Sequence, residues 1–181
     1  MSGAYEIADT LVSQHLVSGV DETEAWFPID TYPSVVRHGK TVMRLTLANG
    51  GPGTADVRLV VYDQDGNLVD RSYQILPVGR QVELSQVDLV DRGKFKGSVR
   101  VVSDVPIGMS AELRTVNVRN ETIVSALPSM FTGASGRVVF PDYADSSERA
   151  TELFLLNRGD GGNVSLRFFS RDGEEMAAIL R

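Results

Sequence analysis

The chain has 181 residues, of which 42% are apolar and 23% charged, with 17 glycines and no cysteine. These proportions are typical of a globular chain rich in turns, and the lack of cysteine excludes disulfides, thiol catalysis and thiolate metal sites. The net charge of −6 argues against a nucleic-acid or anionic-membrane partner, because proteins that bind such partners concentrate Lys and Arg on one face. No membrane-spanning run is found, so we expect no membrane insertion, and an exported protein would carry its signal peptide outside this chain.

The first predicted elements in chain order are strands. TVMRLTLA, residues 41–48, places Met43, Leu45 and Leu47 on one face, which is the alternation of a half-buried strand. ADVRLVVYD continues the pattern at residues 55–63, and the Asp-Gly pair that follows is a turn signal. We therefore predict a β-hairpin over residues 54–75.

The remaining strands are short and are bounded by Gly, Pro or Asp. They are RQVELS, GSVRVVSD, IGMSAELRTV and ETIVSAL, and no stretch shows a sustained helical period with caps. About seven short strands in about 100 residues predict an all-β fold, an antiparallel β-sandwich of immunoglobulin-like or fibronectin type III-like architecture. The Cys and Trp pattern of true antibody domains is absent.

Similar segments within the chain predict a repeat. DTLVS at residues 9–13 returns as ETIVS at 121–125, a separation of 112 (121 − 9), and the Phe-Pro pairs at 27–28 and 140–141 are separated by 113 (140 − 27). The hairpin of residues 54–75 returns as NVSLRFFSRDGEEMAAIL from residue 163, with Gly66 over Gly173. There Val164, Leu166 and Phe168 stand in the places of apolar residues of the first copy. Such self-similarity predicts a tandem repeat with a unit of about 110 residues.

The repeat also predicts the domain organisation. Residues 27–130 form one complete sandwich unit, residues 1–26 match the end of a unit, and residues 131–181 match only the beginning of one. Residues 1–26 would complete the last unit within the chain, or a neighbouring chain would do so.

Several of these runs resemble a repeat of large exported bacterial proteins, namely FKGSVRVVSDVPIGMSAELRT, ETIVSALPS, VFPDYADSSERATELFLLN and VSLRFFSRDG. In that repeat the phrase F-x-G-x-V-x-V-x-S-D-x-P precedes L-R, LP, FP-x-x-A-D and a strand that ends in Asn-Pro. Here Gly50 and Arg158 replace the prolines, and Ser146-Ser147-Glu148 replaces a Gly-rich stretch. The resemblance implies a structural or adhesive module at the cell surface or outside the cell.

A metal site and an active site have weak support. Asp63 and Asp65 of DQDG are candidate Ca²⁺ ligands, but a hairpin turn favours the same residues. The two histidines, His15 and His38, have no equivalent in the other copy, and no nucleophile motif accompanies them. We predict no enzymatic activity, no catalytic residue and no cofactor.

Two kinds of partner remain. Trp26, Tyr32 and Tyr143 flank the Phe-Pro motifs, where aromatic rings would stack on a polysaccharide. For Trp26 the sequence favours the alternative that its ring packs against the core. The C-terminal half-unit should have unpaired strand edges, which invite a protein partner or self-association by strand addition. With a polysaccharide partner the protein would be a carbohydrate-binding module. With strand addition between chains it would be a subunit of a fibre or surface array.

Overall fold

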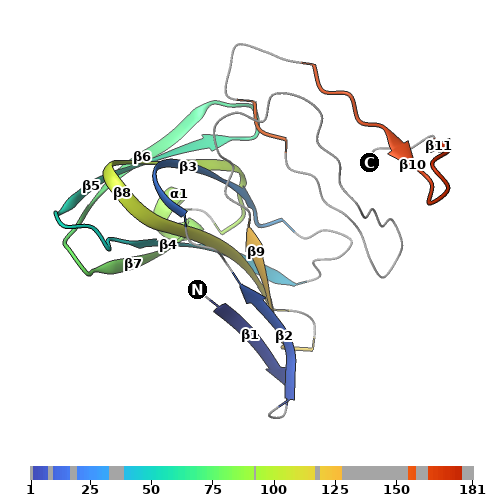
Figure 1. Cartoon of the computed structure of the whole chain (residues 1–181), viewed down its shortest axis with the longest axis horizontal. Coiled ribbons are helices and arrows are strands. Elements are labelled where there is room, and N and C mark those ends of the chain that lie inside the picture. Colours follow the sequence, from blue (N-terminus) through green and yellow to red (C-terminus); the bar gives the residue numbers. More distant parts are fainter. Residues whose placement is uncertain are drawn as a thin grey trace.

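The computed structural model describes residues 2–7, 10–16, 20–32, 39–91, 93–116, 119–127, 155–157 and 163–176. Nearly all of the ordered elements are antiparallel strands (Figure 1), which confirms the all-β fold class. No described helix is long and apolar enough to cross a membrane. The elements are β1 (Ser2–Ile7), β2 (Thr10–Leu16), β3 (Val20–Asp30), β4 (Lys40–Ala48), β5 (Ala55–Asp63), β6 (Leu68–Leu76), β7 (Gln81–Ser85), α1 (Gln86–Val90), β8 (Lys96–Val116), β9 (Thr122–Leu127), β10 (Phe168–Phe169) and β11 (Glu175–Met176).

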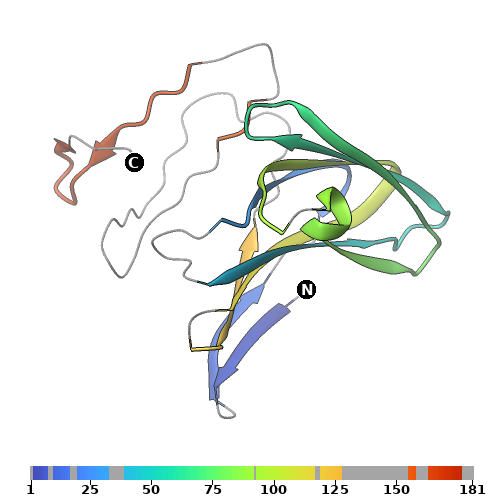
Figure 2. The ribbon, with the colours of Figure 1, turned by 180° about the vertical axis from the view of Figure 1, so that it is seen from behind.

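One long strand, β8, organises the sandwich. Its first half pairs with β5, its second half pairs with β4 and β9, and β3 pairs with part of each half. The sheet order is therefore β6-β5-β8-β4-β7. Figures 1 and 2 show β8 as a curved ribbon through the middle of a curled sheet. The curl brings the apolar faces of β4 and β5 into a single core.

The two predicted strands GSVRVVSD and IGMSAELRTV form a single element, with a change of partner between them. Pairing with β5 ends at Ser103 and pairing with β4 begins at Gly108. Asp104 Oδ1 accepts a hydrogen bond of 2.8 Å from the backbone N–H of Asp56, and Pro106 has no N–H to contribute. The inward side chains keep their alternation across the change, from Val101 to Ile107, so both halves of β8 face the same core.

The core is formed by the inward residues of the paired strands. Nearly all are aliphatic, with the aromatic rings supplied by two phenylalanines. The largest fully buried side chains include Phe27, Ile29, Met43, Leu45, Leu47, Leu59, Leu89, Ile107 and Met109.

A short helix, α1, closes the space between β6 and β7, and sequence periodicity did not predict it. The Ser85 side chain accepts from the N–H of Asp88, and the Asp88 carboxylate accepts from Ser85, which is a capping box. Leu89 is buried in the core. Gln86 Oε1 accepts a hydrogen bond of 2.9 Å from the N–H of Met43, where β7 no longer pairs with β4.

Asn49 joins the two layers beyond β4. Its side chain is buried and donates to the carbonyls of Gly53 at 2.7 Å and Leu76 at 2.8 Å, and its Oδ1 accepts from the N–H of Gly51 at 2.9 Å. Asn49 stands at the position of the strand-ending Asn in the repeat that this chain resembles, and here its side chain connects β4 to the neighbouring loop and to the end of β6. Asp would lack the Nδ2 donor of two of these bonds, and Leu would lack both the donor and the acceptor.

The described N-terminal strands contact the central sheet. β1 and β2 form a hairpin beside β9, and β3 pairs with β8 along both of its halves. β3 spans the predicted boundary between residues 26 and 27. The unit boundaries, and the choice of what completes residues 131–181, stay predictions.

Candidate functional site: an apolar face on the C-terminal hairpin

The C-terminal hairpin is built around one tight turn. Ser170 and Gly173 close it, with hydrogen bonds of 2.7 Å from Ser170 N–H to the carbonyl of Glu174 and 3.0 Å from Gly173 N–H to the carbonyl of Ser170. Gly173 has a φ of 86°, which suits glycine because a side chain would be strained there. The turn sets Phe168 opposite Met176 and Phe169 opposite Glu175.

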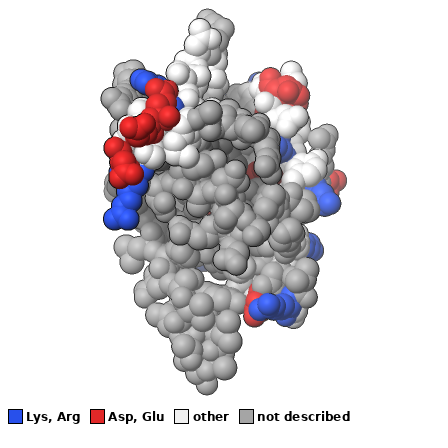
Figure 3. All heavy atoms as spheres, turned by 90° about the vertical axis from the view of Figure 1, so that its right-hand side faces the viewer, with Lys and Arg blue, Asp and Glu red and all other residues white. Residues whose placement is uncertain are grey.

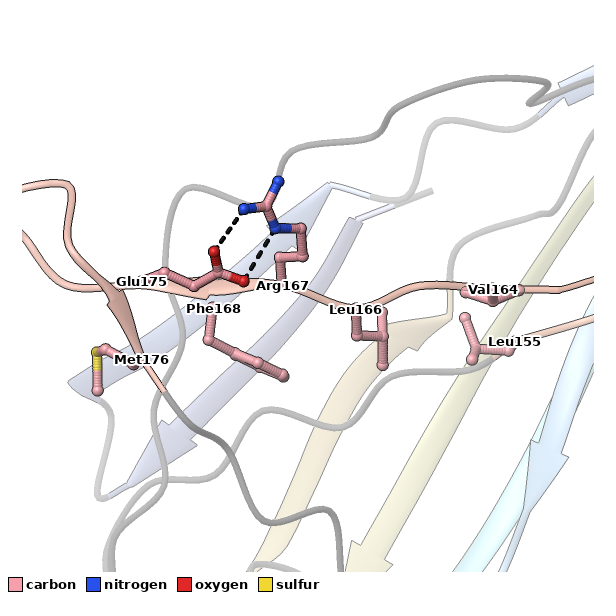
Figure 4. A pocket seen from close by; sticks show the side chains of 7 residues that line it. All are labelled: Leu155, Val164, Leu166, Arg167, Phe168, Glu175 and Met176. Atoms are coloured by element: carbon pink, nitrogen blue, oxygen red, sulfur yellow. Dashed lines mark hydrogen bonds and ion pairs between the residues drawn. The ribbon is translucent and has the colours of Figure 1, made fainter.

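The hairpin has an apolar side and a charged side. Figure 4 shows Leu166, Phe168 and Met176 on one side of the ribbon and Arg167 with Glu175 on the other. The Arg167 guanidinium binds both oxygens of the Glu175 carboxylate, with Nε 3.0 Å from Oε1. These hydrogen bonds hold the pKa of Glu175 below its usual value and raise the pKa of Arg167. Both residues are solvated, so the pair orients the hairpin more than it stabilises it.

A pocket of about 300 Å³ opens beside the apolar side. We call its aliphatic and aromatic lining the hairpin face. No group in it is poised for proton transfer or nucleophilic attack, because its charged members, Arg167 and Glu175, are bound to each other. The hairpin face can therefore bind apolar groups and carries no evident chemistry. It consists of Leu155, Val164, Leu166, Phe168 and Met176.

The turn reproduces the turn between β5 and β6. There the N–H of Asp63 donates to the carbonyl of Asn67 at 2.9 Å, and the N–H of Gly66 donates to the carbonyl of Asp63 at 3.1 Å. Asp63 Oδ1 accepts from the N–H of Asn67 at 2.8 Å, as Ser170 Oγ accepts from that of Glu174 at 3.1 Å. The two hairpins thus share their turn geometry although an Asp in one stands where a Ser stands in the other.

The environments of the two hairpins differ sharply. Val57 and Leu59 of β5 are 1% and 0% exposed, whereas Val164, which stands 107 positions after Val57 (164 − 57), is 65% exposed. Leu155 is exposed as well. Met176 is also exposed, and Leu166 and Phe168 are half-buried. Contiguous exposed apolar side chains are typical of an interaction site.

Sequence reasoning anticipated this region only in part. It predicted unpaired edges in the C-terminal half-unit but named none of these residues as a site. The sequence did carry a signal, because Val164, Leu166 and Phe168 keep the apolar alternation of β5.

A second exposed apolar surface lies on β6. Tyr73 and Ile75 alternate on its outer face and are the most exposed large apolar residues of the described chain. Within the described residues β6 pairs only with β5, so it is an edge of the sheet. An exposed edge strand of this length is a template for strand addition.

The three predicted sugar-binding aromatic residues are in different settings. Trp26 is 9% exposed, stacks on Tyr62 with ring centroids 5.4 Å apart, and donates from Nε1 to Glu24 at 3.0 Å. The Arg100 guanidinium lies 5.6 Å from the Trp26 ring centroid. Tyr32 is 48% exposed, and Tyr143 lies outside the described residues. Carbohydrate binding stays a prediction, with Tyr32 as its accessible ring.

The candidate calcium ligands belong to the first hairpin turn. The Asp63 carboxylate accepts from the N–H groups of Asp65 and Asn67 and from the Asn67 side chain. These bonds, chiefly that from the Asn67 side chain, lower the pKa of Asp63. Within the described residues no cluster of three metal-ligating side chains occurs. Of the histidines, His15 lies in β2 and His38 lies outside the described part.

Charge does not mark a binding surface on the face that Figure 3 displays. Lys and Arg side chains lie there beside Asp and Glu side chains wherever the residues are described. Mixed charge gives little long-range steering of a charged partner.

Comparison with protein-family models gives no match, and comparison with curated proteins gives none either. Among solved structures, the chain is similar to Thermotoga maritima 1070, with a TM-score of 0.47 and 18% identity over 59% of this chain and 92% of that one. It is also similar to the Anabaena sensory rhodopsin transducer, with a TM-score of 0.41 and 19% identity over 52% of this chain and 99% of that one. FlgD from P. aeruginosa has a TM-score of 0.29 and 13% identity over 57% of this chain and 84% of that one. All three scores are too low to assign a function.

Proposed function

We propose that the chain is a non-catalytic structural and adhesive module of a bacterial surface or secreted protein, which binds protein partners through its exposed strands. The observation that carries this proposal is the hairpin face, where Val164 and Leu155 are exposed in positions that suit a core. The exposed apolar side of β6 supports it. The extracellular setting rests on the sequence resemblance to a repeat of exported bacterial proteins.

The repeat is part of this proposal, and two hairpins support it. β10 and β11 share the turn of β5 and β6, as described above. At the other end of the chain, β1 pairs antiparallel with β2 as β8 pairs with β9, and Ser13 and Ser125 of the two second strands are 112 residues apart (125 − 13). Antiparallel pairing of both segments is expected if the chain consists of shifted copies of one unit.

The polar groups of the sandwich favour a structural role. Gln86 satisfies a backbone N–H of β4, and the hydroxyls of Thr41 and Thr115 lie 3.0 Å apart across two paired strands. Buried polar groups that serve the fold in this way are not available for chemistry. Buried polar groups that are hydrogen-bonded within the fold are expected of a structural module.

Sedimentation velocity over a wide range of protein concentration tests the proposal. We expect reversible association that grows with concentration, because exposed apolar strands pair. A fibre or array subunit would form an open series of larger species, whereas a closed pair would stop at a dimer. A chain that stays strictly monomeric up to about 1 mM, a concentration that detects even weak association, would contradict self-association.

The location requires a separate measurement. An antibody against this chain should label intact cells that express the natural protein, and added protease should remove that label. Labelling that appears only after the cells are opened would contradict the extracellular setting while leaving the binding role standing.

A further inference from the structure

The hairpin face corresponds to the inward face of β5, the strand that β8 lies beside in the central sheet. Subtracting 107 from positions 164, 166 and 168 gives positions 57, 59 and 61, and these three β5 residues alternate toward the core. There Val57 pairs with Ser103, Leu59 with Val101 and Val61 with Val99. The natural neighbour of such a face is therefore an antiparallel strand with valines at alternate positions.

The backbone of this segment also lacks the pairing that its counterpart has. Residues 57–61 pair with β6 on one side and β8 on the other. Within the described residues, positions 163–167 pair with no strand. Unpaired N–H and C=O groups beside an apolar face are the two requirements for strand addition.

We propose that the hairpin face binds an extended strand of the Val-x-Val-x-Ser chemistry seen at Val99, Val101 and Ser103, supplied by another copy of the repeat unit. This inference rests on the proposed function and names the partner for one of its surfaces. The incoming strand runs antiparallel to residues 164–168, places its valines against Leu166 and Phe168, and takes the position that β8 holds beside β5.

The charged side of the hairpin makes the register testable. Position 167 corresponds to Val60, which pairs with Arg100 of β8. A strand that carries Arg at this place would set it opposite Arg167, and like charges directly opposite each other are unfavourable. An acidic residue there should therefore strengthen binding, provided that the strand docks in the register of β8.

The experiment uses a fluorescent synthetic peptide with the sequence of residues 96–104, KGSVRVVSD, and the full chain. Fluorescence anisotropy measures its affinity at low salt. A peptide carrying Val99→Asp and Val101→Asp is the first control, because it leaves the chain unchanged. Leu166→Asp in the chain should weaken binding about tenfold or more, because it places a carboxylate against the valines. Ser165→Asp, which adds the same charge one residue away on the opposite side, should change it by less than about twofold.

The register arm uses a peptide with Arg100→Glu. We expect it to bind about threefold more tightly than the parent, and the gain should disappear in a chain with Arg167→Glu. Equal binding of the parent and the double-Asp peptide, or equal losses in Leu166→Asp and Ser165→Asp, would overturn the proposal. A gain for Arg100→Glu that persists in Arg167→Glu would overturn the register.

The outcome is separable from that of the proposed function. If the chain associates with itself but binds no peptide, the strand inference is wrong and the binding role stands. If it binds the peptide in the expected pattern but never associates with itself, the strand inference stands, and self-association fails.

Discussion

At the scale of single residues, the motif F-x-G-x-V-x-V-x-S-D-x-P has a structural explanation. Phe95 is buried, and its N–H donates to Thr31 Oγ1 at 2.8 Å, which fastens the start of β8 to the end of β3. Val99 and Val101 enter the core, Asp104 binds the N–H of Asp56, and Pro106 stands where the strand changes partners. These five positions of the motif therefore serve packing or backbone geometry in this chain.

The Gly of this motif gives the sharpest residue-scale prediction. A Cβ added at Gly97 would lie 2.0 Å from the backbone oxygen of Tyr62 and 2.9 Å from the ring of Phe95. We expect Gly97→Ala to lower the free energy of unfolding by at least about 2 kcal/mol, because backbone must move to admit the methyl group. Urea denaturation followed by circular dichroism measures the change.

Gly108 provides a matched control in the same strand. A Cβ there would meet Ala48 at 3.5 Å and 3.7 Å, which is ordinary contact. Gly108→Ala should change stability by no more than about 0.5 kcal/mol. Equal effects of the two substitutions would show that steric exclusion at Gly97 is not the cause.

At the scale of elements, α1 shows how a very short helix is specified. Five residues cannot display a helical period, but Ser85 followed by Asp88 is a capping pair. Tertiary contacts hold the helix, since Leu89 and Val90 are buried. Isolated helices of this length are not stable in water.

We expect Ser85→Ala to destabilise the protein by about 1 kcal/mol, because it removes the N-cap of α1. Hydrogen bonds from Ser85 lower the pKa of Asp88 below its usual 3.8. The contribution of the Asp88 carboxylate is therefore present above that value and is lost as the pH falls through the lower folded value. Urea denaturation at pH 7 and at lower pH measures the free energy of unfolding. We expect the difference in this free energy between wild type and Ser85→Ala to become smaller as the pH falls.

Asp88→Asn is the control for this pH dependence. Asn retains a side chain that forms hydrogen bonds but cannot titrate. The difference in free energy of unfolding between Asp88→Asn and wild type should therefore also become smaller as the pH falls. If the Ser85→Ala difference were independent of pH while Asp88→Asn destabilised the protein only at neutral pH, the two residues would not act as one cap.

At the scale of the whole molecule, the sandwich is the folding unit that the core defines. All members of the core cluster lie between Ala25 and Leu127, and β3 contributes Ala25, Phe27 and Ile29. Glu24 and Arg100 form a bidentate ion pair across β3 and β8, with N–O distances of 3.1 Å and 3.0 Å. The core and these contacts therefore include residues on both sides of position 26.

This organisation predicts which fragment is stable. A fragment of residues 20–127 should fold with a melting temperature close to that of the full chain, because it keeps the core and all of β3. A fragment of residues 27–127 begins at the predicted unit boundary and loses the Glu24 ion pair and the Trp26–Tyr62 stack. It should melt several degrees lower in a calorimetric scan. Equal stability of both fragments would favour the boundary at residue 27.

The hairpin face also belongs to this scale, because its exposure depends on what the rest of the chain supplies. The same alternation of apolar residues is fully buried in β5, whereas Val164 is exposed and Leu166 and Phe168 are half-buried. β5 lies between β6 and β8 and packs into the core, and within the described residues positions 163–167 pair with no strand. Whether such apolar residues are buried or exposed therefore depends on which other strands lie around them.

The sequence by itself determined the local elements. Period-2 alternation placed β4, β5, β6, β7 and β9 to within a residue or two, and the Asp-Gly pairs marked both hairpin turns, because these signals act over a few neighbouring residues. The tertiary structure alone decided that 97–104 and 107–116 form a single strand and that α1 forms. It also decided that Trp26 is buried against Tyr62 while Val164 is exposed. Those outcomes depend on contacts between residues far apart in the chain, and alternation along one strand carries no information on which strand lies beside it.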